Sequence, residues 1–324
     1  MARPHNILVT GGAGFIGFHV GKRLLREGRS VRILDNLDPF YDREIKLRNV
    51  YEIEEAEFDQ ADIRALATSD DFDEVLQGID AVIHLAALAG VRPSIERPAE
   101  YMDVNVRGTQ VLLDKLRQLE LDIPFIFGSS SSVYGGNTKV PFCEDDPVNT
   151  PISPYAASKR AGELLCHAWH HLSGNPVTCL RFFTVYGPRQ RPEMAIHKFS
   201  RLILGAKKIP FFGDGSTCRD YTYVDDIVDG VVAALDRAQG YNIYNLGGGQ
   251  TTTLAELVEM LEQALDNKAV RDRLPEQPGD VRQTFADVSR AQNDLGYQAK
   301  VTIAEGVAAW SEWYLAERGA GRLA

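Results

Sequence analysis

The chain has 324 residues, of which 44% are hydrophobic and 25% are charged, a composition typical of soluble globular proteins. This length suffices for a full-sized core and indicates one large domain or two interleaved ones. The formal net charge of -10 argues against nucleic acid or an anionic membrane as the main partner.

The first half of the sequence alternates short apolar runs with stretches of helical periodicity. The apolar runs predict buried parallel strands at residues 7–10, 31–35, 81–85, 123–127 and 177–181. The stretches between them predict helices at residues 15–27, 72–77, 99–119 and 155–171. Repeated β-α units indicate the α/β class, with a doubly wound, Rossmann-type parallel sheet and helices on both of its faces.

Beyond residue 182 the alternation gives way to loops rich in glycine, proline and arginine. Helices are predicted at residues 195–204, 225–238, 254–265 and 303–316. We therefore expect a Rossmann domain at residues 1–182 and a smaller, mostly helical lobe at residues 183–324, with a strand at 241–246 returning to the large sheet. The acidic stretch at residues 52–62 is expected to be a solvated connection.

Several other kinds of site and location are disfavoured. The seven histidines show no metal-ligand spacing, so no metal site is expected. The N-terminus shows no signal-peptide pattern, and no uncharged apolar run approaches the ~18 residues of a membrane span. The cysteines form no CxxC pair and are interpreted as reduced thiols of a cytoplasmic protein: Cys143, Cys166, Cys179 and Cys218.

A glycine-rich turn links the first predicted strand to the first predicted helix, with glycines at Gly11, Gly14 and Gly17. The first glycine permits a tight turn, the second lets backbone approach a pyrophosphate, and the third allows close packing of helix on strand. The start of the helix, with Phe15 and Ile16, adds free N–H groups and a positive dipole. The turn therefore predicts a dinucleotide site, the alternative being a purely structural turn.

Strand ends complete the expected cofactor site. Asp35 ends the second strand about twenty residues after the turn, where an acid binds the adenosine ribose. Its charge would repel a 2′-phosphate, which favours NAD over NADP, and Asn36 could assist through its amide. The other residues expected beside the cofactor are small or lie at strand ends: Leu85, Ala86, Ala87, Asp62 and Ile63. The segment at 85–87 would equally suit a plain core.

Tyr155 and Lys159 are four residues apart in a predicted helix, so they share one of its faces. An ammonium beside a phenol favours the phenolate, which lowers the pKa of the phenol and makes it a usable base. Beside a dinucleotide, such a base indicates hydride chemistry at a carbinol carbon. Taken alone, the pair could be an exposed helix face.

The motifs follow one another over nearly the whole chain: the glycine turn, Asp35, residues 85–87, the serines at 129–132, Tyr155 with Lys159, and residues 181–188. This set resembles the extended short-chain dehydrogenases/reductases, in the branch of nucleotide-sugar epimerases and dehydratases. The resemblance implies that Tyr155 removes a sugar hydroxyl proton while hydride passes to NAD. It implies that Lys159 holds the nicotinamide ribose, that Ser130 shares the proton, and that Ser132 adds a second hydroxyl.

The serine run separates the reactions of this family. Members that dehydrate carry acidic residues at the positions of Ser131 and Ser132, and decarboxylating members carry glutamate at the position of Ser132. Both reactions need a second proton-transfer group, whereas this chain offers only hydroxyls there. The resemblance thus favours 4-epimerisation through a 4-keto sugar, with substrate contacts from Ser130, Ser131 and Ser132.

Residues 181–195 are similar to those of UDP-glucuronate 4-epimerases, whereas glucose/galactose 4-epimerases carry asparagine where Thr184 stands. Arg191, with Thr184, is the candidate for binding the sugar carboxylate, because a guanidinium matches a carboxylate with two hydrogen bonds. Arg191 could instead bind the pyrophosphate or be a solvated loop arginine. The remaining alternatives are UDP-glucose/UDP-galactose epimerisation, UDP-glucuronate decarboxylation and a non-catalytic NAD-binding regulator.

The resemblance also assigns the UDP group. Arg219 matches an arginine on the pyrophosphate, and Asp280 matches an acid near the uridine ribose. Arg92 is expected in a loop near the nicotinamide side, from which it could also approach the sugar. Gln277 departs from the arginine common in galactose-type epimerases, which leaves Arg282 as a possible second pyrophosphate ligand. In similar enzymes the helices matching 99–119 and 155–171 pair as a four-helix bundle, which implies a homodimer.

Overall fold

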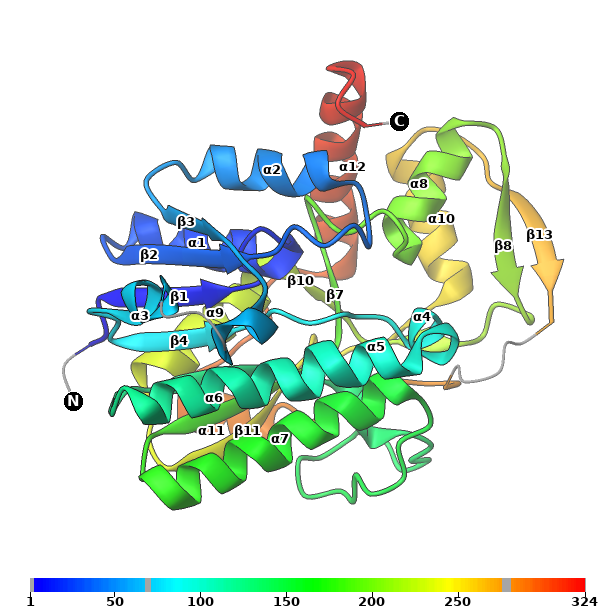
Figure 1. Cartoon of the computed structure of the whole chain (residues 1–324). Helices are drawn as coiled ribbons and strands as arrows, with labels where there is room; N and C mark the ends of the chain where they lie inside the picture. Colours follow the sequence, from blue (N-terminus) through cyan, green and yellow to red (C-terminus); the bar gives the residue numbers. More distant parts are fainter. Residues whose placement is uncertain (1–2, 68–70, 276–280, 324) are drawn as a thin grey trace.

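The computed structural model describes residues 3–67, 71–275 and 281–323. Its centre is a sheet of seven parallel strands in the order β11-β6-β5-β4-β1-β2-β3 (Figure 1). These strands are β1 (Asn6–Thr10), β2 (Ser30–Asp35), β3 (Glu57–Gln60), β4 (Ala81–His84), β5 (Phe125–Ser130), β6 (Val177–Phe182) and β11 (Tyr241–Leu246). The predicted doubly wound α/β fold is confirmed, and the strand order reverses between β1 and β4.

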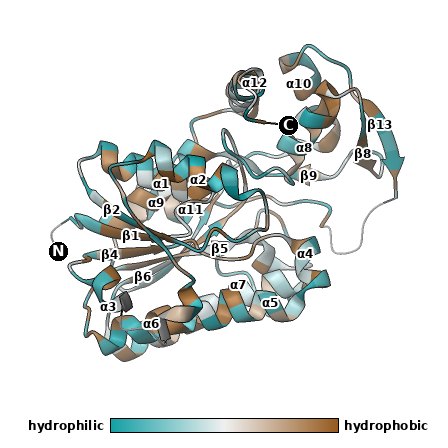
Figure 2. Cartoon of the chain, turned by 45° about the horizontal axis from the view of Figure 1, so that its top comes forward, coloured by the Kyte–Doolittle hydropathy of each residue, from teal (hydrophilic) through white to brown (hydrophobic). Residues whose placement is uncertain are grey.

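The central strands are apolar because both faces of the sheet are covered. Every residue of β4, β5 and β6 is buried. Alternate side chains enter different cores: Ile7 and Val9 of β1 pack into one cluster and Leu8 into another. Figure 2 shows the same distribution, with hydrophobic strands inside and hydrophilic helix surfaces outside.

Helices supply the two covering layers. On one face lie α1 (Phe15–Arg26), α9 (Val224–Asp236) and α11 (Ser289–Leu295), whose apolar residues share a cluster with Ile7. On the other face lie α3 (Asp71–Leu76), α6 (Gly108–Gln118) and α7 (Pro154–Ser173), which share the cluster of Leu8. The helix α2 (Arg43–Glu52) lies beyond the edge formed by β3 (Figure 1).

A smaller lobe stands at the carboxyl ends of the strands (Figure 1). It contains the helices α8 (Ala195–Leu204), α10 (Leu254–Ala264) and α12 (Ile303–Gly319). Its short strands pair as β7 (Thr184–Tyr186) with β10 (Tyr221–Tyr223), β8 (Lys208–Phe212) with β13 (Val270–Leu274), and β9 (Cys218–Arg219) with β12 (Thr252–Thr253). Apolar residues of this lobe join the same cluster as β1, so the two parts share a core.

The structure corrects two expectations about local structure. The stretch at 52–62 is not a mere connection, because β3 pairs in parallel with β2. Its charged residues conceal the strand pattern, since an edge strand leaves such side chains partly in water. The helix predicted at 99–119 is interrupted by a π-helical turn at Asp103–Arg107, between α5 (Pro98–Met102) and α6.

Three helices, α2, α4 (Val91–Glu96) and α11, had no counterpart among the predicted elements. The first two bury polar side chains. Neither has a clear apolar stripe: α2 buries only Lys46 and Asn49, and α4 buries only Ser94. Their burial is polar and comes from neighbouring segments, which periodicity does not report. In the parts of the chain that the structure describes, no helix is long and apolar enough to cross a membrane.

Candidate active site

The main cavity opens where the strand order reverses, at the carboxyl ends of β1, β4 and β5. It has a volume of about 370 Å³ and is lined from both parts of the molecule. Every residue expected beside the cofactor lines it: Gly11, Gly14, Phe15, Ile16, Gly17, Asp35, Asn36, Asp62, Ile63, Leu85, Ala86, Ala87, Tyr155 and Lys159. Ser130, Ser131, Ser132, Thr184 and Arg191 line the same cavity.

The glycine turn fits a dinucleotide. A Cβ on Gly11, whose φ is 71°, would lie 2.6 Å from the Ala86 nitrogen, and one on Gly17 would lie 2.3 Å from the Gly11 oxygen. A Cβ on Gly14 would meet only the Gly11 oxygen, at 3.1 Å, so the second glycine leaves room on the cavity side. The first turn of α1 carries no acidic residue, and its N–H groups face an anion site without competition.

Acidic residues lie at the ends of β2 and β3, where the adenosine of the cofactor was expected. The carboxylate of Asp35 accepts a hydrogen bond from the Leu37 N–H at 2.8 Å, and Lys46 lies 4.0 Å away. Burial raises the pKa of Asp35, while Lys46 and backbone N–H groups oppose that rise. Asn36 donates to Asp62 at 2.9 Å, and hydrogen bonds from Arg64 hold the pKa of Asp62 at about 2.

Tyr155 and Lys159 lie on the first turns of α7, which is capped by Ser153 and begins with Pro154. The ring of Tyr155 packs edge-to-face against Tyr101 at 6.2 Å, which helps to orient the phenol. The Lys159 ammonium is buried and donates to the Gly128 oxygen at 2.8 Å. Burial lowers the pKa of Lys159 to about 8.

The pKa of Tyr155 differs from the sequence-based expectation. Burial raises it above its ordinary value, and the opposing influences are a hydrogen bond with Ser130 and the charge of Arg191. Lys159 is not among the groups that lower it. Burial, Ser130 and Arg191 therefore set the pKa of Tyr155 among the chain's own groups, and the Lys159 ammonium donates to the Gly128 carbonyl.

The serine run follows β5 and turns into the cavity. Ser130 is the last residue of β5, and Ser131–Tyr134 form a 3-10 turn whose Ser132 N–H donates to the Ser130 hydroxyl at 3.2 Å. Ser129 donates to Glu163 at 2.7 Å. Glu163 is fully buried and is held by Arg181, with N–O distances of 2.8 and 3.0 Å. This buried ion pair fixes the backbone that presents Ser130.

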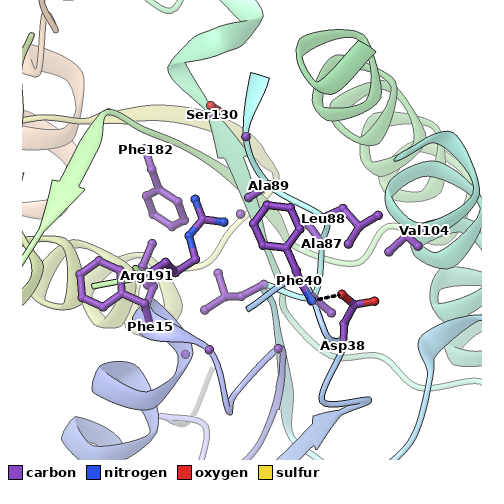
Figure 3. A pocket seen from close by; sticks show the side chains of 18 of the residues that line it. Phe15, Asp38, Phe40, Ala87, Leu88, Ala89, Val104, Ser130, Phe182 and Arg191 are labelled. Atoms are coloured by element: carbon purple, nitrogen blue, oxygen red, sulfur yellow. Dashed lines mark hydrogen bonds between the residues drawn. The ribbon is translucent and has the colours of Figure 1, made fainter. Parts of the chain in front are cut away.

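Arg191 is the cation that reaches the middle of the cavity. Figure 3 shows its guanidinium pointing inward between Phe182, Phe15 and Phe40. Its charge lowers the pKa of Tyr155, which shows that the two groups are close enough to interact. Its Nε also lies 3.1 Å from the exposed carboxylate of Glu193, which does not line this cavity.

A second cavity, of about 280 Å³, adjoins the first and shares Thr184 with it. It is lined by Arg92, Arg219 and Arg282, together with the aromatic rings of Phe212 and Tyr221. The Arg92 guanidinium lies 5.0 Å from the centre of the Phe212 ring. Positive charge beside aromatic surface suits a nucleoside diphosphate. Asp280 and Gln277 lie outside the residues that the structure describes.

Sequence reasoning missed several residues that line the main cavity: Phe40, Tyr41, Lys46, Val104 and Met194. Most come from the segment after β2, which carries no recognised motif. Lys46 gave no usable signal either, since its burial and its position 4.0 Å from Asp35 are visible only in the structure. Within residues 3–67, 71–275 and 281–323, no group of three histidine, cysteine or acidic side chains could hold a metal ion.

Comparison with known proteins places these features in a family. The model of the NAD dependent epimerase/dehydratase family matches residues 7–247. A UDP-glucuronate 4-epimerase of Thermodesulfobacterium geofontis is 43% identical over 310 residues, covering 94% of this chain and 95% of that protein.

Solved structures are also similar over nearly the whole chain. A UDP-glucuronic acid 4-epimerase from Bacillus cereus, in complex with UDP-glucuronic acid and NAD, has a TM-score of 0.89 and 37% identity, and covers 96% of this chain and 99% of its own. A UDP-glucose 4-epimerase from Thermotoga maritima, with UDP-glucose, has a TM-score of 0.87 and 33% identity, covering 97% and 99%.

Proposed function

The chain belongs to the NAD-dependent epimerase/dehydratase family, and on that premise we propose that it interconverts UDP-glucuronate and UDP-galacturonate. The reaction is an isomerisation at C4 of the sugar, using tightly bound NAD and passing through a 4-keto sugar. The observation that carries the choice of substrate is the position of Arg191, inside the cavity and close enough to Tyr155 to lower its pKa.

The cofactor is held by the glycine turn, by Asp35 and by the strand-end residues around them. NAD, when bound, accepts the hydride from C4 of the sugar and later returns it. Asp35 accepts hydrogen bonds from the hydroxyls of the adenosine ribose, and its charge disfavours a 2′-phosphate. Lys159, buried beside the Gly128 carbonyl, holds the nicotinamide ribose.

Tyr155 takes the proton of the sugar C4 hydroxyl as general base. Ser130 donates to the developing phenolate or to the sugar oxygen, and Ser132 and Ser131 supply further hydroxyls along the same edge. Burial keeps the phenol protonated at neutral pH, so the base form must be stabilised by nearby positive charge when the site is filled. Returning the proton from Tyr155 to the keto oxygen completes the exchange.

The residues around the keto sugar explain why the reaction stops at epimerisation. Ser131 and Ser132 stand where eliminating relatives need acids, so no group is placed to remove a second proton. The 4-keto sugar turns about its bond to the UDP and presents its other face to the cofactor. Hydride return then gives the C4 epimer with no net oxidation.

The UDP group occupies the second cavity. Arg219 binds the pyrophosphate, Arg92 and Arg282 add positive charge, and the rings of Phe212 and Tyr221 border the same space. Thr184 stands between the two cavities and contacts the sugar. Asp280 is proposed for the uridine ribose from the family resemblance alone.

Arg191 and Thr184 bind the sugar carboxylate. Once C4 is a ketone, the substrate is a β-keto acid, which loses CO2 when its carboxylate-bearing bond stands perpendicular to the ketone. A guanidinium that holds the carboxylate with two hydrogen bonds prevents that geometry. A neutral sugar has no carboxylate to hold, so it would not need Arg191 in this way.

We further propose a cytoplasmic homodimer. The four cysteines are unpaired, as in a reducing compartment. Apolar side chains stand exposed on helices of one side, with Met102 of α5 at 39%, Leu164 of α7 at 54% and Leu172 of α7 at 80% exposure. Pairing α5, α6 and α7 with those of a second copy would cover them.

The test is to incubate the purified protein with UDP-glucuronate, without added NAD, and to separate the products by chromatography. UDP-galacturonate without CO2 is the expected result. A UDP-pentose would identify a decarboxylase instead. Turnover of UDP-glucose but not of the uronate would make the assignment of Arg191 wrong, and no turnover of either sugar would favour a non-catalytic regulator.

A further inference from the structure

The loop at residues 187–191, which carries Arg191, is fastened to the cofactor-binding half at two points. His19 Nε2 lies 2.9 Å from the Pro188 oxygen, and burial lowers the pKa of His19 to about 4, so the neutral ring donates to that carbonyl. Arg189 Nη1 donates to Asn49 Oδ1 at 2.5 Å. Both contacts join the loop to residues near the glycine turn.

The backbone of the loop sends two neighbouring arginines in opposite directions. Arg189 has a φ of 67°, which is uncommon outside glycine. Its guanidinium lies 4.3 Å from the centre of the Phe18 ring on α1 and pairs with Glu52. Arg189 lines a hollow bordered by residues of α2 and α12, whereas Arg191 points into the active-site cavity (Figure 3). The position of Arg191 therefore depends on where Arg189 is held.

Asn49 connects this loop directly to the cofactor turn. Its side chain is 1% exposed, and its Nδ2 donates to the Ala13 oxygen at 2.9 Å. The N–H of the same residue, Ala13, donates to the Asp35 carboxylate. The two ends of one buried amide thus join the glycine turn and Arg189, with a buried hydrogen bond to Ala13 and a part-buried one from Arg189.

We propose that Asn49 and Arg189 are positioning residues, which fix the Arg191 loop to the glycine turn and so set the orientation of the substrate carboxylate relative to the cofactor. The inference rests on the proposed function, because its consequence concerns a uronic acid. Asn49 and Arg189 line neither the main cavity nor the second one. They act through Arg191, and their effect is on which product leaves the site.

The side reaction that they suppress can be stated bond by bond. In the 4-keto intermediate, the C5–C6 bond breaks, CO2 leaves, and the electron pair of that bond forms the C4–C5 enolate. A proton from water then adds at C5. The step requires the C5–C6 bond to stand perpendicular to the ketone plane, so an Arg191 that shifts with its loop permits it.

The experiment measures the ratio of released CO2 to UDP-galacturonate, using UDP-glucuronate labelled at C6 and the purified holoenzyme. Arg189→Leu and Asn49→Leu each replace a polar side chain with an apolar one and so remove the link. We expect the ratio to rise about tenfold in both, which corresponds to about 1.4 kcal/mol in relative barrier height. Arg189→Lys, which keeps one donor, should lie between these variants and the parent protein.

The matched control is Arg48→Leu, which removes the same charge from α2. Arg48 donates to the carbonyl oxygens of Arg322 and Glu44, neither of which belongs to the 187–191 loop, although it lines the same hollow as Arg189. Its product ratio should stay within about twofold of the parent, as for a surface substitution away from the site. A rise equal to that of Arg189→Leu would overturn the inference.

A purely structural role would lower total turnover and thermal stability but leave the product ratio unchanged, and that result would also overturn the proposal. Amide hydrogen exchange in the segment 188–194 independently measures how firmly the Arg191 loop is held. It should become faster in Arg189→Leu and Asn49→Leu, and unchanged exchange would contradict the link. If the parent protein forms no UDP-galacturonate, the proposed function fails, while the exchange measurement still decides whether the loop is held.

Discussion

The side of the cavity that we propose for the cofactor and the side that we propose for the substrate differ in which atoms line them. The cofactor side is mostly backbone: a glycine turn, the start of α1, and the ends of parallel strands. The substrate side consists of side chains such as Thr184, Arg191 and Arg219, which come from loops and short strands of the smaller lobe. Cofactor binding therefore follows from the fold itself, whereas the choice of sugar depends on how a few loops are held.

The largest expected effect breaks the chemistry while sparing both binding sides. Tyr155→Phe removes the proton acceptor but keeps the ring that packs against Tyr101. Turnover should fall by about 10²–10⁴-fold, the range typical for general acid–base groups. The purified variant should still contain NAD, which is measured by denaturing the protein and quantifying the released cofactor. Retention of more than a tenth of the activity would remove Tyr155 from the mechanism.

The next substitution breaks the cofactor side alone. In Gly17→Ala, the new Cβ would lie 2.3 Å from the Gly11 oxygen, a contact with backbone that has no flexible end to move. We expect a loss of about 1–3 kcal/mol in the free energy of unfolding, together with loss of bound NAD. Thermal denaturation and NAD content measure both effects.

Its control is the same change at Gly319, the last residue of α12, where a Cβ would meet nothing within 4 Å. Gly319→Ala should leave the NAD content unchanged and leave stability equal or slightly higher. If Gly17→Ala behaved like Gly319→Ala, the close packing of the glycine turn would not be needed for cofactor binding.

A third change sharpens the contrast by altering the substrate side only. Arg191→Leu, made in the Tyr155→Phe background to prevent turnover, should weaken UDP-glucuronate binding by about 10- to 100-fold, as expected for losing charged hydrogen bonds. UDP-glucose binding should change by less than about twofold, since the neutral sugar has no carboxylate to lose. Calorimetric titration with the two ligands gives the comparison. An equal loss for both would assign Arg191 to the pyrophosphate.

The smallest expected effect concerns pH. Ser130 hydrogen-bonds to Tyr155 and lowers its pKa, so Ser130→Ala should raise that pKa further. The active form is the phenolate, which forms as pH rises through the pKa. The rising limb of the profile of kcat/KM against pH should therefore move to higher pH. A limb that stays in place, or moves to lower pH, would contradict the proposed contact.

The sequence predicted well which residues around the glycine turn meet at the main cavity, because the signals for them are local. Gly11, Gly14 and Gly17 occupy fixed places between a strand and a helix, and Asp35 ends the next strand, so the fold alone brings them together. The prediction of the seven-stranded sheet was less complete, because it lacked the edge strand β3. The charged edge strand β3 does not alternate in hydropathy, and α2 and α4 bury polar residues that periodicity does not detect.

The substrate side was predicted only through resemblance, residue by residue. Nothing in the local sequence around Arg191 specifies that its guanidinium enters the cavity, because that depends on a left-handed Arg189 and on Asn49 from a distant helix. The state of Tyr155 also escaped prediction. The spacing correctly places Lys159 on the same helix face as Tyr155. The Lys159 ammonium donates to the Gly128 carbonyl, and burial raises the pKa of the Tyr155 phenol.

The central claim is that hydrogen leaves C4 as hydride and returns to the same carbon from the bound cofactor. The most direct test uses UDP-glucuronate carrying deuterium at C4, incubated with the purified protein in ordinary water without added NAD. The account predicts UDP-galacturonate that keeps its deuterium at C4. Product that has exchanged this deuterium for hydrogen from water would contradict it.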